Sequence, residues 1–156
     1  YYELQGMLIE NADEPQAAVI ARAIISNIKK GNDISTTTQL QKIIKDALKH
    51  VPHMSDEEIK KSCQRCFQAL RIDVNHEFEV LDEFLEKLPN VLAAGGRVAI
   101  LSFHSGEDRR VKKSFKRFFN EGIYREIAPD PIRPSSEECH SNSRAHSAKL
   151  RWAIKA

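Results

Sequence analysis

The sequence is poor in cysteine and has no long apolar run, and each shortage excludes a class of protein. Its 156 residues include only 3 cysteines. An odd, small number argues against a disulfide-stapled secreted domain and for a reducing compartment. No apolar stretch approaches the ~20 residues that a membrane-spanning helix needs. With 6 glycines and 6 prolines, the chain is neither collagen-like nor of low complexity.

Charge is nearly balanced overall but unevenly placed along the chain. The 24 Lys and Arg against 22 Asp and Glu leave a net charge of +2. Charged residues at 29% and hydrophobic residues at 41% are the proportions of a globular protein, and the length is that of one domain. Residues 77–86 are acidic on their solvent side, and residues 109–117 are strongly basic. The basic run is compatible with nucleic-acid contact, although such a run is more often a solvated helix face.

Apolar spacing predicts helices over the first half of the chain. Isoleucines four positions apart within residues 16–30 indicate one helix. A cluster of Ser and Thr at 35–38 is typical of N-caps and precedes a second helix over 40–48. The Ser-x-x-Glu sequence at 55–58 has the form of a capping box. It opens the longest periodic stretch, up to residue 88, which predicts one long helix or two nearly collinear ones.

The second half changes to a mixed pattern. Residues 97–103 form a short apolar run, as expected of a strand buried on both faces of a parallel sheet. A helix is expected over 107–119, and the segment 128–147, rich in Pro and Ser, is expected to be mostly loop. Residues 148–155 alternate, which predicts an antiparallel strand at a sheet edge. The residues expected on its covered face are Ala148, Leu150, Trp152 and Ile154. Because so few strands make a poor sheet, others are expected upstream or from a partner.

Polar residues follow the apolar run at 97–103. Ser102, His104 and Ser105 lie at a strand end, where open α/β sheets bind ligands. Asp108 and Arg109 lie in the first turn of the next helix, where an acid suits the positive helix end. Simple capping is one alternative. A Ser/His/Asp hydrolase is another, disfavoured because the chain has no Gly-x-Ser-x-Gly elbow.

Two further sets of polar residues are candidates for ligand contact. Arg71 and Asn75 are four positions apart and share one helix face. Arg144, Lys149 and Arg151 lead into and occupy the last strand, where they present together the cations that phosphate groups need. A surface pair and a solvated edge strand are the respective alternatives.

Two His and Cys spacings suit either a metal site or core packing. His50 and His53 precede Cys63 and Cys66 with zinc-like separations. The cysteines, however, lie on the apolar face of a helix, where buried thiols are common. We therefore expect no metal site.

Four segments of the sequence match the motifs of one protein family. They read FQALRIDVNHEF, AGGRVAILSFHSGEDRRVK, NSRAHSAKLR and ENADEPQAAVIARAI. They resemble the C-terminal half of the RsmH (MraW) family of rRNA methyltransferases, in which the corresponding motifs are FQALRIxVNxEL, PGGRLxxISFHSLEDRxVK, NPRARSAKLR and EYGEExxARRIARAI. The departures include Gly106 for Leu, Ser143 for Pro and His146 for Arg, with Ala18 and Val19 for paired arginines.

The resemblance implies a fold and its division. We expect an α/β protein, the C-terminal portion of a class I (Rossmann-like) methyltransferase sandwich with part of a helical insertion domain. Residues 1–54 would end the insertion, and residues 55–156 would belong to the methyltransferase domain. Because the chain starts at Tyr1 and lacks the family's cofactor loop, it is expected to belong to a longer polypeptide and to be inactive alone.

The resemblance also implies an activity. The family transfers a methyl group from S-adenosylmethionine to the exocyclic N4 amine of a cytidine in small-subunit rRNA, by direct attack and without a metal. The donor site is expected upstream of Tyr1, with no cofactor-binding residue in this chain. The alternative is a non-catalytic, RsmH-like assembly or binding factor on the small ribosomal subunit.

The motif matches assign residues and partners. The candidates for lining or bracing the target base are Asn75, Ser102, His104, Ser105, Asp108 and Arg109. The candidates for RNA contact are Arg71, Arg144, Ser147, Lys149 and Arg151. We expect small-subunit rRNA as partner, no membrane, and a cytoplasmic location, or a mitochondrial matrix location for an organellar member. A homodimer is left open.

Overall fold

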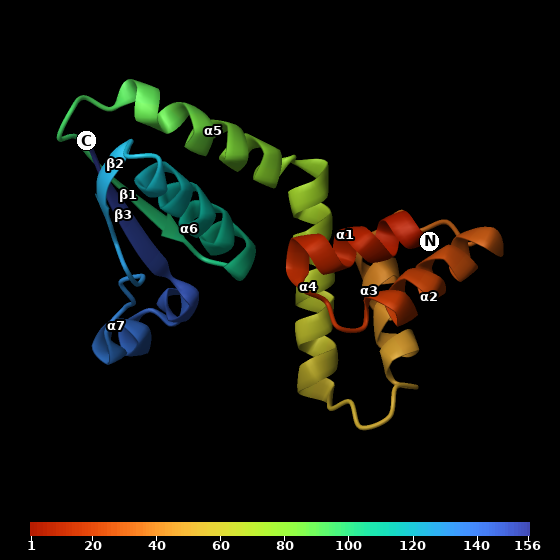
Figure 1. Ribbon diagram of the computed structural model, residues 1–156. Coiled ribbons are helices and arrows are strands. Elements are labelled where there is room, and N and C mark those ends of the chain that lie inside the picture. Colours follow the sequence, from red (N-terminus) through yellow and green to blue (C-terminus); the bar gives the residue numbers. More distant parts are fainter. The chain divides into compact units, whose positions relative to one another are not determined.

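Four helices make up the first half of the molecule. The computed structural model describes residues 1–156, and its contacts divide them into two compact units, Tyr1–His76 and Glu77–Ala156, each described here by itself. The helices of the N-terminal unit are α1 Tyr2–Ala12, α2 Ala17–Lys29, α3 Thr37–Leu48 and α4 Asp56–Val74 (Figure 1). The last three confirm the expected helices, whereas α1 was not predicted.

The two expected helix starts carry their capping residues. Thr36 Oγ1 accepts a hydrogen bond from the backbone N–H of Gln39 at 3.2 Å, and the Gln39 side chain accepts one from the Thr36 N–H at 3.0 Å. Ser55 and Glu58 form the same reciprocal pair, at 3.3 and 2.8 Å. Each pair satisfies two backbone donors that a helix start would leave without partners.

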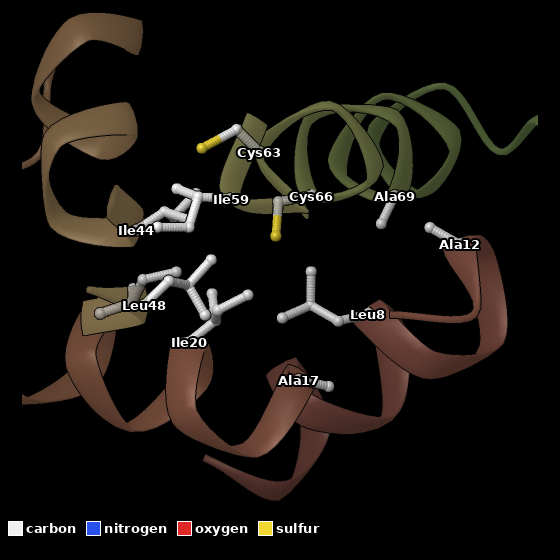
Figure 2. Packing of buried hydrophobic residues seen from close by; sticks show 11 residues of the cluster. Leu8, Ala12, Ala17, Ile20, Ile44, Leu48, Ile59, Cys63, Cys66 and Ala69 are labelled. Atoms are coloured by element: carbon white, nitrogen blue, oxygen red, sulfur yellow. The ribbon is translucent and has the colours of Figure 1, made fainter. Parts of the chain in front are cut away.

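The helices of this unit meet in an apolar core (Figure 2). Its largest fully buried aliphatic side chains are Leu8, Ile20, Ile44 and Leu48. Burying each contributes roughly 1.5–3 kcal/mol relative to exposure. Cys63 and Cys66 of α4 lie in the same core, as their spacing indicated. Ile28 is 53% exposed, so the apolar face of α2 stops one turn before the helix does.

A buried carboxylate binds the turn between α1 and α2 to α4. The Glu14 side chain is fully buried and accepts hydrogen bonds from Ser62 Oγ at 2.9 Å, Arg65 Nε at 2.7 Å and the backbone N–H of Gln16 at 2.9 Å. These donors compensate the charge, so the acid is tolerated inside the unit. The partners on α4 are 48 and 51 positions away, and no local sequence pattern indicates such a contact.

The long periodic stretch forms two helices instead of one. α4 ends at Val74, α5 spans Glu77–Val91, and His76 between them has a left-handed φ of 51°. The compact units also divide at His76, whereas the expected domain boundary followed residue 54. The reason is that α4 packs on α1 and α3 and belongs to the N-terminal unit.

The C-terminal unit is built on an antiparallel sheet of three strands. β1 Arg97–Ser102, β2 Tyr124–Ile127 and β3 Lys149–Lys155 are arranged in the order β1-β3-β2. The antiparallel direction of the last strand is confirmed, but its edge position is wrong. It lies in the centre because the short strand β2, which was not predicted, pairs on its other side. β1, expected inside a parallel sheet, is antiparallel to β3 and lies at the edge.

Helix α6, Ser105–Asn120, covers one face of this sheet, and on β3 this is the face that was expected to be open to solvent. Val98 and Ala153 pack with Phe115 of the helix. The set of β3 residues expected to face solvent therefore faces α6, and Arg151 is only 6% exposed. On the other face, Leu101 is 52% exposed, so β1 is not buried on both faces. Alternation separates the two faces of a strand but does not say which one a helix covers.

The segment 128–147 is less irregular than expected. It contains a short helix, α7 Ser136–Ser141, and a 3₁₀-helix, η1 Ser143–Ser147. Ser135 caps α7 by accepting a hydrogen bond from the backbone N–H of Glu138 at 3.1 Å. Such short elements rest on local capping and carry too few apolar positions to show a period. None of the molecule's helices combines the length and the apolar character needed to span a bilayer.

Candidate active site and nucleic-acid interface

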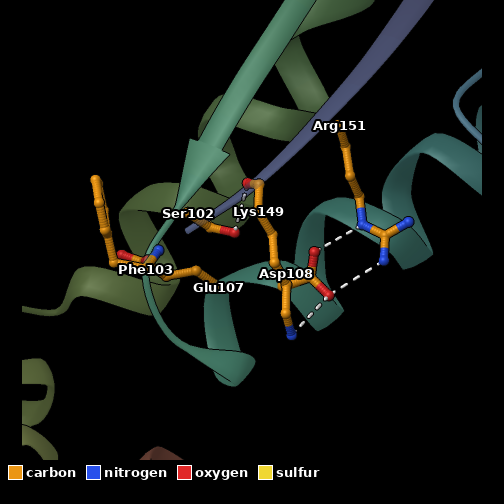
Figure 3. Close-up of polar contacts among 6 residues, drawn as sticks. All are labelled: Ser102, Phe103, Glu107, Asp108, Lys149 and Arg151. Atoms are coloured by element: carbon orange, nitrogen blue, oxygen red, sulfur yellow. Dashed lines mark hydrogen bonds and ion pairs between the residues drawn. The ribbon is translucent and has the colours of Figure 1, made fainter. Parts of the chain in front are cut away.

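A buried ion pair binds the first turn of α6 to the central strand (Figure 3). The Asp108 carboxylate accepts two hydrogen bonds from Arg151, at 2.7 Å from Nε and 3.1 Å from Nη2. The two side chains are 9% and 7% exposed. Lys149 Nζ lies 3.7 Å from the same carboxylate. The hydrogen bonds from Arg151, with the added charge of Lys149, hold the pKa of Asp108 below its ordinary value.

This pairing brings together residues that sequence analysis assigned to separate roles. Asp108 was a candidate for the base side, and Arg151 and Lys149 were candidates for RNA contact. The guanidinium of Arg151 is buried and is hydrogen-bonded to Asp108. The side chain of Lys149 is 22% exposed, so part of it remains accessible to solvent.

Glu107 closes the turn between β1 and α6. Its Oε2 accepts a hydrogen bond from the backbone N–H of Phe103 at 3.2 Å, and its Oε1 lies 3.4 Å from His104 Nε2. The contact with His104 and the backbone N–H of Phe103 lower the pKa of Glu107. Sequence analysis did not name this acid as a candidate. Its place three residues after the helix cap is the position of the acid in a capping box, and that signal could have identified it.

His104 is enclosed where β1 ends. It is the N-cap of α6 but makes no capping hydrogen bond through its side chain. The imidazole is 14% exposed, and both ring nitrogens are buried without a hydrogen-bond partner. Ser102 nearby is 4% exposed and donates from Oγ to the backbone carbonyl of Lys149 at 3.4 Å. Both side chains are therefore enclosed in the turn.

Ser105 and Arg109 differ from the other candidates of this turn because they are exposed. They lie in the first turns of α6, next to the enclosed groups, and can reach a ligand there. The geometry does not support a Ser/His/Asp relay. Asp108 binds Arg151, Ser102 binds a backbone carbonyl, and neither contacts the imidazole of His104.

Arg71 and Asn75 belong to the N-terminal unit. Asn75 is the exposed C-cap of α4. Arg71 lines a groove of about 650 Å³ between α3 and α4. The other lining residues are Gln41, Lys45, Lys60, Cys63, Gln64, Phe67 and Gln68. Three cations, three amides and no carboxylate make this groove suitable for a ligand that carries phosphate groups.

The remaining RNA candidates lie in η1. Arg144 and Ser147 are exposed, and the Asn142 side chain fixes the start of η1 by accepting a hydrogen bond from the Arg144 N–H at 3.2 Å. Both can meet a nucleic-acid backbone.

The basic run on α6 divides into two sets. Arg110 and Arg117 form ion pairs with Asp82 and Glu86 of α5. These pairs hold the two helices against each other, so the cations are engaged inside the unit. The lysines that take no part in these pairs and are exposed are Lys112, Lys113 and Lys116.

The His and Cys residues with zinc-like spacing do not converge. No group of three or more His, Cys, Asp or Glu side chains is arranged to hold a metal ion. Burial raises the pKa of Cys66 to about 12 and also raises that of Cys63. A thiol that stays protonated is a poor metal ligand.

Comparison with known proteins gives a consistent result. The model of the MraW methylase family matches residues 1–156. A protein named ribosomal RNA small subunit methyltransferase H 2, from Alkaliphilus metalliredigens, is 79% identical over 99% of this chain and 44% of its own length. One named methyltransferase H 1, from Lachnoclostridium phytofermentans, is 64% identical over 99% of the chain and 42% of its own length. The chain thus spans less than half the length of these relatives.

Replacing Asp108 by Asn should destabilise the C-terminal unit by about 3 kcal/mol, because it leaves the charge of Arg151 buried without its counter-ion. Urea unfolding of the chain, followed by the fluorescence of Trp152 on β3, measures this loss. Glu86→Gln is the matched control, since it removes an acid from an exposed pair with Arg117 and should cost less than about 1 kcal/mol. Equal losses in the two variants would contradict the importance of the buried pair.

The same variant carries a pH signature. The lowered pKa of Asp108 means that its contribution is present above the unfolded pKa of about 3.9 and is lost as the pH falls through the lower folded value. The free energy of unfolding of Asp108→Asn should therefore depend less on pH below about pH 4 than that of the parent chain.

Proposed function

Since the chain belongs to the MraW methylase family, we propose that it forms part of a methyltransferase acting on small-subunit ribosomal RNA. The methyl group would pass from S-adenosylmethionine to the exocyclic N4 amine of a cytidine. The main support is that the family match covers residues 1–156, including the junction of β1 and α6 with its buried pair Asp108–Arg151. The names of the bacterial relatives support rRNA as the substrate, and a cytoplasmic location follows from that proposal.

The three-stranded sheet is consistent with being one part of a larger, Rossmann-like fold. β1 has only one neighbouring strand, and Leu101 exposes half of its surface on the face that α6 does not cover. We assign the unit Glu77–Ala156 to the methyltransferase domain. We assign Tyr1–His76 to the helical insertion, which moves the division from residue 54 to His76.

This chain's own residues do not fit the methyl donor. The donor carries a positive sulfonium group, which needs acidic or neutral surroundings. The α3–α4 groove is lined by three cations and no acid. The carboxylate of Asp108 is neutralised by Arg151, and that of Glu107 contacts His104 and Phe103. We therefore propose that a further segment, equivalent to the rest of the relatives' length, holds the donor.

The chain's part in the reaction would be to align the target base. An exocyclic amine is a weak nucleophile, so its rate depends mainly on orientation toward the donor's electrophilic methyl group and on removal of its proton. Ser105 and Arg109, which are exposed, would contact the nucleotide. Ser102, His104 and Asp108, which are buried or nearly so, would hold that turn in place. Asn75 stays a candidate from the N-terminal unit.

RNA binding would use the exposed cations. Arg144 and Ser147 in η1 and Arg71 in the α3–α4 groove are positioned for phosphate contact, and Lys149 contributes in part. The exposed lysines of α6 add positive charge to the C-terminal unit. Arg151 is withdrawn from this set because its charge is bound to Asp108.

Joining the chain to the N-terminal segment of the Alkaliphilus metalliredigens relative tests the proposed activity. Isothermal titration of S-adenosylmethionine should show binding by the chimera and none by the chain alone. The chimera should also methylate small-subunit rRNA, with N4-methylcytidine found by mass spectrometry of the digested RNA. His104→Ala should reduce this product because it removes the imidazole that is enclosed in the turn before Ser105.

The alternative function gives a different result. A chimera that binds small ribosomal subunits but neither binds the donor nor yields methylcytidine would support an assembly factor. Donor binding by the chain alone would contradict the placement of the donor site. Full rRNA modification by the His104→Ala chimera would remove that residue from the proposed site.

Phosphate contacts predict a change in the salt dependence of RNA binding. Arg144→Gln should weaken binding of a single-stranded RNA and lower the slope of log K against log salt by about 0.7. Lys87→Gln is the control, because it removes the same charge from a lysine that already pairs with Glu83. Fluorescence anisotropy at several salt concentrations measures the slopes. A slope change as large in the control would show that only net charge matters.

A further inference from the structure

Gly106 lies where its backbone does not require glycine. It is in the first turn of α6, is buried, and has no left-handed φ. At such a site alanine ordinarily stabilises a helix by up to about 1 kcal/mol. Space explains the glycine instead. A Cβ at this position would lie 2.5 Å from Cζ of Phe78 and 3.3 Å from Nδ1 of His104.

Phe78 occupies that space from α5. Its side chain is 5% exposed, and its ring centroid lies 5.8 Å from that of His104, with the rings tilted by 45°. On α6, the guanidinium carbon of Arg110 lies 4.1 Å from the centroid of the same phenyl ring, and Arg110 also forms an ion pair with Asp82 of α5. The ring is thus fixed between a cation and an imidazole.

Polar contacts give the imidazole of His104 little orientation. Neither ring nitrogen has a hydrogen-bond partner, and Nε2 lies 3.4 Å from Oε1 of Glu107. A side chain without hydrogen bonds takes its orientation from packing. The atoms that pack against it include the phenyl ring of Phe78 and the backbone of Gly106.

We propose that Phe78 and Gly106 act as a matched pair that positions His104 for the methyl transfer. The phenyl ring fits only because position 106 has no side chain, and it turns the imidazole toward Glu107. The proposal rests on the proposed function for its role in catalysis. The two family phrases carry leucine where this chain has Phe78 and Gly106, so here the large side chain comes from α5 instead of α6.

Replacing glycine by alanine inside a helix usually stabilises a protein, and the pair predicts the opposite effect at position 106. Gly106→Ala should lower the Tm of the 156-residue chain by about 5 °C or more, because the new Cβ meets the phenyl ring. In the background of Phe78→Leu, which shortens the side chain, the same substitution should no longer lower Tm. Gly6→Ala is the matched control. Gly6 lies inside α1, and a Cβ added there would have nothing within 4 Å, so this change should raise Tm.

A second measurement reports on His104 itself. Long-range ¹H–¹⁵N NMR spectra of the chain give the tautomer and the titration of its imidazole. Phe78→Leu should shift these signals, Phe78→Leu combined with Gly106→Leu should bring them back toward the parent, and Gly6→Ala should leave them unchanged. A change in stability alone would not produce this pattern.

Two results would overturn the proposal. One is a rise in Tm for Gly106→Ala comparable to that for Gly6→Ala while Phe78 is present. The other is an unchanged His104 spectrum in Phe78→Leu. Neither measurement uses methyl transfer, so failure of the proposed function would leave both interpretable.

Discussion

The arrangement of the C-terminal unit depends on one buried ion pair, Asp108 with Arg151. The pair spans 43 positions of sequence and joins the start of α6 to the central strand of the sheet. Because both hydrogen bonds are directional, they fix the orientation of the helix start relative to β3 as well as its distance from that strand. The turn that carries His104 and Glu107 runs from β1 into this helix start, so its geometry follows from the pair. A charge that looks suited to RNA in the sequence is used instead to hold the turn.

Helices cover the two faces of the sheet in the C-terminal unit unequally. α6 and the apolar residues of α5 close one face of the sheet, while Leu101 and the free edge of β1 remain open on the other side. Parallel and mixed sheets of α/β enzymes usually carry helices on both faces. One face of the sheet is uncovered, and the chain is shorter than its relatives. Both facts are explained if further strands and helices complete the sheet. The methyl donor would then bind to the added part, and this chain would present the target nucleotide.

Much of the fold could be predicted from local patterns, and much of the site could not. The period of the apolar residues indicated α2, α3, α4 and α6, and capping residues located two helix starts correctly. α1 and β2 were missed, since β2 is short and α1 has only a weak apolar face. The edge position of β3 and the solvent exposure of its Arg151 face were wrong, because pairing and helix packing are set by distant segments. Ser102 and His104 were named as candidates for their place at a strand end and Asp108 for its place in the next helix turn, and these roles stay predictions. The pairing of Asp108 with Arg151, and the fit of Phe78 over Gly106, are contacts between elements that no local spacing encodes.

We propose that the free edge of β1 pairs with a strand outside this chain. Hydrogen–deuterium exchange of the β1 amides tests it most directly, by comparing the chain alone with the chimera that carries the N-terminal segment of the relative. The account predicts that β1 amides not bonded to β3 exchange rapidly in the chain alone and much more slowly in the chimera. Equally rapid exchange in both would contradict it, because the edge would then stay open in the longer polypeptide as well.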